Sequence, residues 1–138
     1  MKIEPYLIFE GRTEEALRFY EKTLGAKVDV IMRFKDSPEP QYNPPNSGDK
    51  VMHSLFRIGD AQIMASDGSC TGKPGFQGFS LTINAASPAE AEQRFKALAE
   101  GGQVQMPLAE TFFAKSFGCV ADRFGVSWMV IAGPKDPA

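Results

Sequence analysis

The sequence has little of what most metal and redox sites are built from, with one histidine and two cysteines in 138 residues. Cys70 and Cys119 do not form a spaced metal or redox motif. The N-terminal stretch MKIEPYLIFEG also lacks the apolar segment of a signal peptide. We therefore expect a cytoplasmic protein in which both cysteines are reduced thiols.

Long apolar runs and a bias toward one sign of charge are lacking as well. No run approaches the roughly 18–20 residues that cross a bilayer. The net charge is −2, with acids and bases spread along the chain. The chain has no block of basic residues that would indicate nucleic-acid binding. The sequence thus predicts neither a membrane partner nor a nucleic-acid partner.

Apolar residues make up 43% of the chain and include 11 phenylalanines, enough for one domain with a sizeable core. Thr13 is the expected N-cap of a helix that Gly25 ends. Four prolines make the loop Lys35–Lys50 irregular. The predicted elements of the first half are, in chain order, a strand over 3–9, a helix over 14–24, a strand over 26–34, the Pro-rich loop, and a hairpin of strands over 51–58 and 61–66.

The second half repeats this order, with Ser87 as the N-cap of its helix and Gly101 at its end. Arg18-Phe19, Gly25 and Val28 recur 76 residues later (101−25) as Arg94-Phe95, Gly101 and Val104. Because the sequence repeats internally, each motif has a counterpart in the other half with which it can be compared. The predicted modules cover about residues 1–68 and 76–132.

Each module has the order β-α-β-β-β, in which one helix can cover only one face of a four-stranded sheet. Pairing two modules around a shared space would bury the other face. We therefore predict an α+β fold in which the two modules form a curved mixed sheet around a concave cavity, completed in a homodimer. The loop Lys35–Lys50 would then be a lid or a dimer-edge element, because long loops are usually functional or disordered.

The repeat, the helix–strand junction RFYEKTLGAKV and the final Asp-x-x-Gly turn together resemble the vicinal oxygen chelate superfamily, which includes glyoxalases, bleomycin-resistance proteins and extradiol dioxygenases. The stretches PYLIFEG, MHSLFRIGDAQIMASD, QMPLAETFFAKSFG and DRFGVSWMV resemble its PhnB-like branch, often labelled 3-demethylubiquinone 3-methyltransferase-like. The resemblance spans Pro5 to Ile131 and implies a single domain of this type over residues 1–138.

In metal-using relatives, the first and fourth strands of each module supply the metal ligands. Matching these strands places the four positions at Glu4, Met64, Phe79 and Met129. Of these side chains only that of Glu4 suits a hard cation, because a thioether is a soft ligand and a phenyl ring is none. A one-residue slip would offer Ser66 and Ser80 instead. We therefore expect no metal ion at these four positions.

The methyltransferase label would require a site for a nucleotide-type cofactor. Such a site usually has a Gly-rich turn between a strand and a helix. The segment GKPGFQG over residues 72–78 has the glycines, but the sequence after it predicts a strand. Bound S-adenosylmethionine is therefore not supported, and we expect no cofactor.

His53 is the one side chain suited to general acid–base chemistry near neutral pH. The alternative is a strand histidine that hydrogen-bonds to a neighbour. Alternation places His53, Leu55 and Arg57 on one face of their strand, and Met52, Ser54 and Phe56 on the other. It does not say which face is concave.

Other candidate residues also have a packing alternative. Asp67 could contact a ligand or Lys115, or it could begin a turn. Phe112 and Lys115 lie in an irregular stretch of the kind that lines pockets, or Phe112 and Phe113 close the mouth of the cavity. Tyr6 shares the face of Glu4 and could line a pocket or pack in the core. The predicted ligand contacts are Glu4, Tyr6, Met64, Ser66, Asp67, Phe79, Phe112, Lys115 and Met129, and His53 is the candidate catalytic residue.

Three functions fit these observations. The first is a metal-free binding protein that encloses a partly apolar or aromatic small molecule. The second is an enzyme of lyase, isomerase or dioxygenase type, with an atypical metal site or with His53 as acid or base. The third is a dimeric interaction module without a small ligand.

Overall fold

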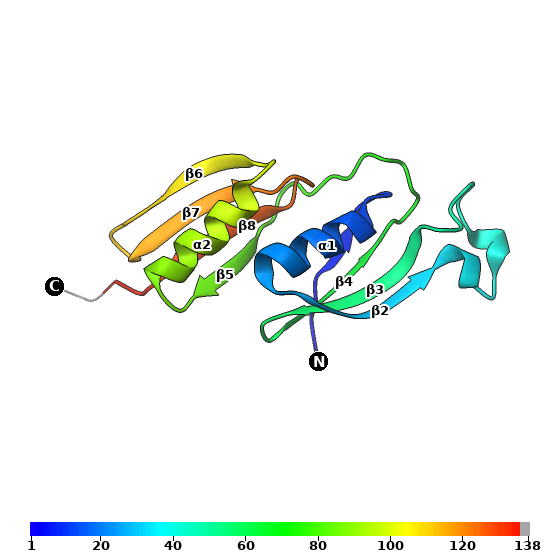
Figure 1. Ribbon diagram of the computed structural model, residues 1–138, viewed down its shortest axis with the longest axis horizontal. Coiled ribbons are helices and arrows are strands. Elements are labelled where there is room, and N and C mark those ends of the chain that lie inside the picture. The colour runs from blue at the N-terminus through cyan, green and yellow to red at the C-terminus, as the bar shows by residue number, and fades with distance from the viewer. Residues whose placement is uncertain (136–138) are drawn as a thin grey trace. The chain divides into compact units, whose positions relative to one another are not determined.

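The structure is a computed structural model, and it describes residues 1–135. Contacts divide the chain into two compact units, Met1–Gly75 and Phe76–Ala138. Each unit contains one α-helix and one four-stranded sheet (Figure 1). The predicted α+β class with two modules is confirmed. None of the helices in the described range is long and apolar enough to cross a membrane.

The sheet of unit one has the strand order β1-β4-β3-β2. β1 runs parallel to β4, and the other neighbouring strands are antiparallel. The elements of this unit are β1 (Tyr6–Ile8), α1 (Thr13–Leu24), β2 (Lys27–Arg33), two short 3₁₀ turns (Phe34–Asp36 and Pro40–Tyr42), β3 (Val51–Ile58) and β4 (Ala61–Ser66).

Unit two repeats the arrangement, with the strand order β5-β8-β7-β6 and β5 parallel to β8. Its elements are β5 (Leu81–Ala85), α2 (Pro88–Ala99), β6 (Gln103–Ala109), β7 (Ser116–Ala121) and β8 (Ser127–Ala132). The irregular segment predicted between β6 and β7 is present, because residues 110–115 belong to no helix or strand.

The repeat extends to the strand register. The edge strand of each sheet has an irregularity at the same place, between Val28 and Val30 in β2 and between Val104 and Met106 in β6. One row of residues therefore crosses each sheet at corresponding positions. The row is Tyr6, Met64, Leu55 and Val30 in unit one, and Thr82, Met129, Cys119 and Met106 in unit two.

Each helix packs on one face of the sheet of its own unit. In unit one the Tyr20 ring of α1 stacks on Phe56 of β3, with ring centroids 6.2 Å apart. In unit two Phe95 of α2 lies over Gly118 of β7, where an added Cβ would come within 2.8 Å of the Phe95 ring. These contacts identify the helix-covered face of each sheet and leave the opposite face for other contacts.

The helix ends follow the sequence except at one position. Ser87 Oγ accepts a hydrogen bond from the Glu90 N–H at 3.1 Å, as predicted for the N-cap of α2. Gly25 and Gly101, past the ends of α1 and α2, both have positive φ values, 67° and 76°. The predicted N-cap Thr13 is wrong, because Thr13 is already helical and its N–H donates to Asp67.

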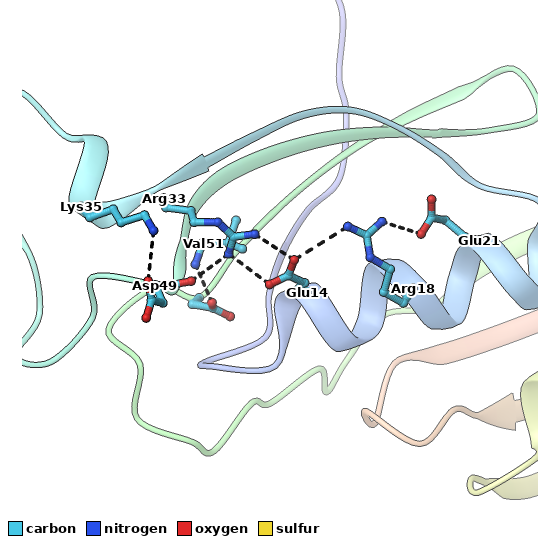
Figure 2. A network of polar contacts seen from close by, with 8 residues as sticks. Glu14, Arg18, Glu21, Arg33, Lys35, Asp49 and Val51 are labelled. Carbon is cyan, nitrogen blue, oxygen red and sulfur yellow. Dashed lines mark hydrogen bonds and ion pairs between the residues drawn. The ribbon is translucent and has the colours of Figure 1, made fainter.

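The loop Lys35–Lys50 is linked to α1 through Arg33, the last residue of β2 (Figure 2). The guanidinium of Arg33 donates two hydrogen bonds to the Glu14 carboxylate, at 2.8 and 3.0 Å, and a third to the Asp49 carbonyl. Lys50 donates to the Gly11 carbonyl at 2.9 Å. Both ends of the loop are therefore anchored to unit one.

Candidate functional site

The two faces of the unit-one sheet differ in what they present. Ser54 and Phe56 are fully buried on the face that packs against α1. His53, Leu55 and Arg57 project from the other face and are partly or fully exposed. The alternation in the sequence predicted these two sets correctly, and the position of α1 now shows that His53 lies on the open face.

Tyr6 and His53 form a hydrogen-bonded pair on this open face. The Tyr6 hydroxyl lies 3.0 Å from His53 Nδ1, and the two ring centroids are 5.7 Å apart. Tyr6 comes from β1 and His53 from β3, so the pair spans the intervening strand β4. Both predicted alternatives for His53 remain open, because the ring is held by a neighbour and is also accessible.

Apolar side chains surround this pair. In the strand register Met64 lies beside Tyr6, Leu55 lies beside Met64, and Met32 lies opposite His53. Several of these side chains keep substantial exposure, including Tyr6 at 44% and Met32 at 41%. We call this set the open-face patch, which consists of Tyr6, Ile8, Met32, His53, Leu55 and Met64.

Charged side chains on or next to the strands of this sheet are already paired. Arg57 donates to both carboxylate oxygens of Asp29, at 2.8 and 3.1 Å, and these bonds lower the pKa of Asp29. Glu4 accepts from Gln62 at 2.7 Å and lies 3.0 Å from the Lys2 ammonium. The Gln62 bond, followed by the Lys2 contact, lowers the pKa of Glu4. Glu4 is therefore ionised near neutral pH, and the Lys2 ammonium balances its charge.

The four positions expected from metal-using relatives do not form equivalent pairs. Met64 is paired with Tyr6, and Met129 is paired with Thr82. Phe79 lies before β5, which begins at Leu81, and is 47% exposed. Within residues 1–135, no three His, Cys, Asp or Glu side chains are grouped as a metal site requires.

Asp67 has a structural role that uses both of its carboxylate oxygens. It is 1% exposed. Oδ1 accepts from the N–H groups of Gly11 and Thr13, and Oδ2 accepts from the N–H of Val51, at 2.8–2.9 Å. Its carbonyl accepts from the Cys70 N–H, which closes a turn. The turn alternative for Asp67 is therefore confirmed. Its two carboxylate oxygens thus hold the start of α1 and the start of β3 to the end of β4.

Ser66 shares the face of Met64 on β4, but little of it is exposed. It is 5% exposed, and its Oγ accepts from the Gly68 N–H at 3.2 Å. Its hydroxyl therefore contributes to the turn after β4.

Phe112 and Lys115 lie in the irregular segment of unit two, and both are exposed. Phe112 is 91% exposed, and its ring meets the edge of Phe113, which in turn meets Phe117 of β7. These three rings form an aromatic ladder on the surface of unit two. Phe112 therefore presents most of its ring to solvent.

The open face of the unit-two sheet carries Met129, Cys119 and Thr82 in one row. Beside this row, the hydroxyls of Ser80 and Ser127 lie 2.8 Å apart. The glycine-rich segment over residues 72–78 leads directly to β5, and α2 begins only at Pro88. It therefore does not form the strand–turn–helix unit in which nucleotide-type cofactors are usually bound.

The sequence does not identify two members of the open-face patch. Ile8 and Met32 were not predicted, although each lies beside a predicted residue. In β2 the register shifts between Val28 and Val30 and again after Met32, so simple alternation misassigns the faces. A signal was available for Ile8, because it is two residues after Tyr6 and lies on the same face.

Comparison with known proteins gives the family. The profile of the family described as 3-demethylubiquinone-9 3-methyltransferase matches residues 1–131. The chain belongs to this family. It is 33% identical to Protein YjdN of Escherichia coli over 145 residues, which covers 99% of each chain.

Solved structures share both sequence and fold with this chain. Protein PA1353 from Pseudomonas aeruginosa is 45% identical, with a TM-score of 0.85 over 98% of this chain and 99% of the other. A PhnB protein from Bacillus cereus, titled a putative 3-demethylubiquinone-9 3-methyltransferase, is 29% identical, with a TM-score of 0.81 over 96% and 100%. A glyoxalase-related enzyme from Fulvimarina pelagi, 16% identical with a TM-score of 0.62 over 96% and 88%, shares the fold alone.

Proposed function

We propose that this chain is a cytoplasmic small-molecule binding protein of the vicinal oxygen chelate superfamily, and that it holds its ligand on the open-face patch without a metal ion. The observation that supports this most directly is the Tyr6–His53 pair, a polar contact among the apolar side chains of the open-face patch. Small-molecule sites commonly combine an apolar lining with a few polar groups that fix the orientation of the ligand.

The hydrogen bonding of His53 defines what the ligand meets. Nδ1 is engaged by Tyr6, and within the described chain this is the hydrogen bond that His53 makes. The other ring nitrogen, Nε2, is left for a ligand. When Tyr6 donates to Nδ1, Nε2 carries the proton and donates to an acceptor oxygen. The ligand class is therefore an aromatic or amphipathic molecule with one acceptor group.

The apolar members of the patch suit the rest of such a molecule. Met64 and Met32 are flexible thioethers that adapt to ligand shape and make favourable contacts with aromatic rings. Leu55 and Ile8 add aliphatic surface. Burying this surface under a ligand is favourable at roughly 25 cal/mol per Å² of apolar area.

A thermal-shift screen of small aromatic and amphipathic compounds tests the proposal. The protein is treated with EDTA, dialysed and compared with untreated protein. We expect compounds that carry an acceptor oxygen to raise the unfolding temperature equally in both samples, and calorimetry to give one ligand per chain. Binding that appears only after a divalent ion is restored would contradict metal-free binding. No shift with any compound class would favour the interaction-module hypothesis.

Catalysis by His53 is a second candidate, which the same contact favours. A histidine oriented by a hydrogen bond to one nitrogen can exchange a proton through the other. In that case His53→Gln would lose turnover of a bound carbonyl compound while binding is largely kept. Equal loss of binding and turnover would instead assign His53 to binding alone.

We also propose that the protein is a homodimer. β6 is an edge strand, and its Val104 is exposed beside α2. A groove of about 760 Å³ lies between this strand and α2, with Phe95 and Leu108 in its lining. Exposed apolar edges of this kind are usually covered in soluble proteins. Light scattering should give twice the chain mass of 15.1 kDa, and a mass near 15.1 kDa at micromolar concentration would contradict the dimer.

A further inference from the structure

Three sulfur-containing side chains lie next to one another on the open face of the unit-two sheet. Met106 of β6 is paired with Cys119 of β7, and Cys119 is paired with Met129 of β8. The chain has six methionines and two cysteines, so three of its eight sulfur atoms occupy one row. We call this set the sulfur row.

The register brings the three side chains to the same face. Residues directly opposite in neighbouring antiparallel strands point to the same side, with Cβ atoms about 4.5–5.5 Å apart. Val120 and Trp128 are buried on the helix-covered face, so Cys119 and Met129 point to the other. The register shift between Val104 and Met106 turns Met106 to that same face.

The row is accessible from solvent. Met106 is 48% exposed, and Cys119 and Met129 are each partly exposed. Cys119 is a free thiol in the centre of the row, and a flexible thioether lies on each side of it. Both thioethers are long enough to fold over the central sulfur, because methionine has three rotatable side-chain bonds.

Apolar packing alone does not require sulfur at these positions. The corresponding row of unit one has Val30 where unit two has Met106, and Leu55 where unit two has Cys119. Only Met64 keeps a sulfur atom in that row. The same position in the same fold is therefore filled by aliphatic side chains in one unit and by sulfur donors in the other.

We propose that Met106, Cys119 and Met129 form a binding site for a soft monovalent cation of the Cu(I) class. Thiolate and thioether ligands select Cu(I) over hard cations, which prefer carboxylate and carbonyl oxygens. On binding, the Cys119 thiol releases its proton to solvent as the metal–sulfur bond forms, and the metal keeps its oxidation state. The two thioethers complete a three-sulfur site. Met129, at a position where the sequence predicts no hard-cation site, would thus contribute to a soft-cation site, and none of the three residues belongs to the open-face patch.

Anaerobic competition with a coloured Cu(I) chelator tests the site. The reduced protein is titrated into the Cu(I)–bicinchoninate complex, and the loss of colour measures transfer of the metal. We expect the wild-type protein to remove one equivalent. Cys119→Ser and the double variant Met106→Leu/Met129→Leu should each weaken the affinity by at least about tenfold, since even outer-sphere partners of a metal are worth that much.

Matched variants outside the row distinguish this site from an isolated thiol or thioether. Cys70→Ser and Met52→Leu should bind Cu(I) as the wild type does, and excess Zn(II) should not displace it. Leucine replaces methionine with little change of volume, so the double variant should stay folded, which thermal unfolding checks. No transfer of metal to the wild type would overturn the proposal. Wild-type affinity in the double variant would also overturn the proposal, because Cys119 would then bind the metal without the two thioethers.

Discussion

The Tyr6 hydroxyl lies 3.0 Å from Nδ1 of His53, although 47 positions separate the two residues in the chain. β1 pairs in parallel with β4, and β4 pairs with β3, so the contact requires both ladders to be in register. The pair is therefore a product of the module's topology. This contact fixes the orientation of the His53 ring within the open-face patch.

Replacing either member of this pair should weaken ligand binding more than it affects folding. We expect Tyr6→Phe and His53→Ala each to reduce the affinity for an acceptor-bearing ligand by about tenfold, the equivalent of one hydrogen bond. Calorimetry measures the affinity and thermal unfolding the stability. Tyr42→Phe is the matched control, since Tyr42 is 76% exposed on the Pro-rich loop. An equal loss of affinity in Tyr42→Phe would contradict the site.

The sequence could predict the order of the elements because the signals for it are local. Ser87, Gly25 and Gly101 lie at helix ends whose geometry depends on neighbouring residues alone. The wrong N-cap at Thr13 has the opposite cause. The N–H of Thr13 is satisfied by Asp67, which is 54 positions away, and no local pattern carries that information.

The candidate site was predicted less completely than the fold. Phe79, Leu81 and Ile83 form one alternating apolar series, so the sequence does not show that the strand begins only at Leu81. The face of His53 could not be assigned until the position of α1 was known. Site residues depend on which sheet face the helix covers, and that is a tertiary property.

Asp67 should be one of the most sensitive positions for stability. Asp67→Ala would leave the N–H groups of Gly11, Thr13 and Val51 without their buried acceptor. Losing such charge-assisted bonds should lower the free energy of unfolding by about 3 kcal/mol or more, measured by urea denaturation. Asp60→Ala, in the exposed β3–β4 turn, should change it by less than about 0.5 kcal/mol. Similar effects of the two changes would contradict this role.

Gly118 should not tolerate a side chain. A Cβ at this position would lie 2.8 Å from the Phe95 ring and 2.9 Å from the Leu108 Cα, and the latter is backbone that cannot move aside easily. We expect Gly118→Ala to destabilise the protein by about 1–3 kcal/mol through overpacking. Urea denaturation followed by the fluorescence of Trp128, the one tryptophan of the chain, measures this in unit two.

Gly75→Ala is the control for that change, since no atom lies within 4 Å of a Cβ added at Gly75. It should leave the unfolding midpoint almost unchanged. If Gly118→Ala were as stable as Gly75→Ala, the close approach of α2 and β6 to β7 would be wrong.

The ion pair between Glu14 and Arg33 should make stability depend on pH in the acid range. The hydrogen bonds from Arg33 lower the pKa of Glu14 from its usual value of 4.5. The unfolded chain therefore binds a proton at a higher pH than the folded chain does. The stabilisation is fully present above pH 4.5 and is lost as the pH falls through the lower, folded pKa.

Glu14→Gln should accordingly reduce the loss of stability below pH 4.5, measured as urea midpoints at several pH values. The effect should be small and should shrink in high salt, because the Glu14 side chain is 44% exposed and solvent screens the pair. Glu39→Gln, at an exposed position of the Pro-rich loop, provides the matched control. The same acid dependence in Glu14→Gln as in the wild type would show that Arg33 does not hold this carboxylate in solution.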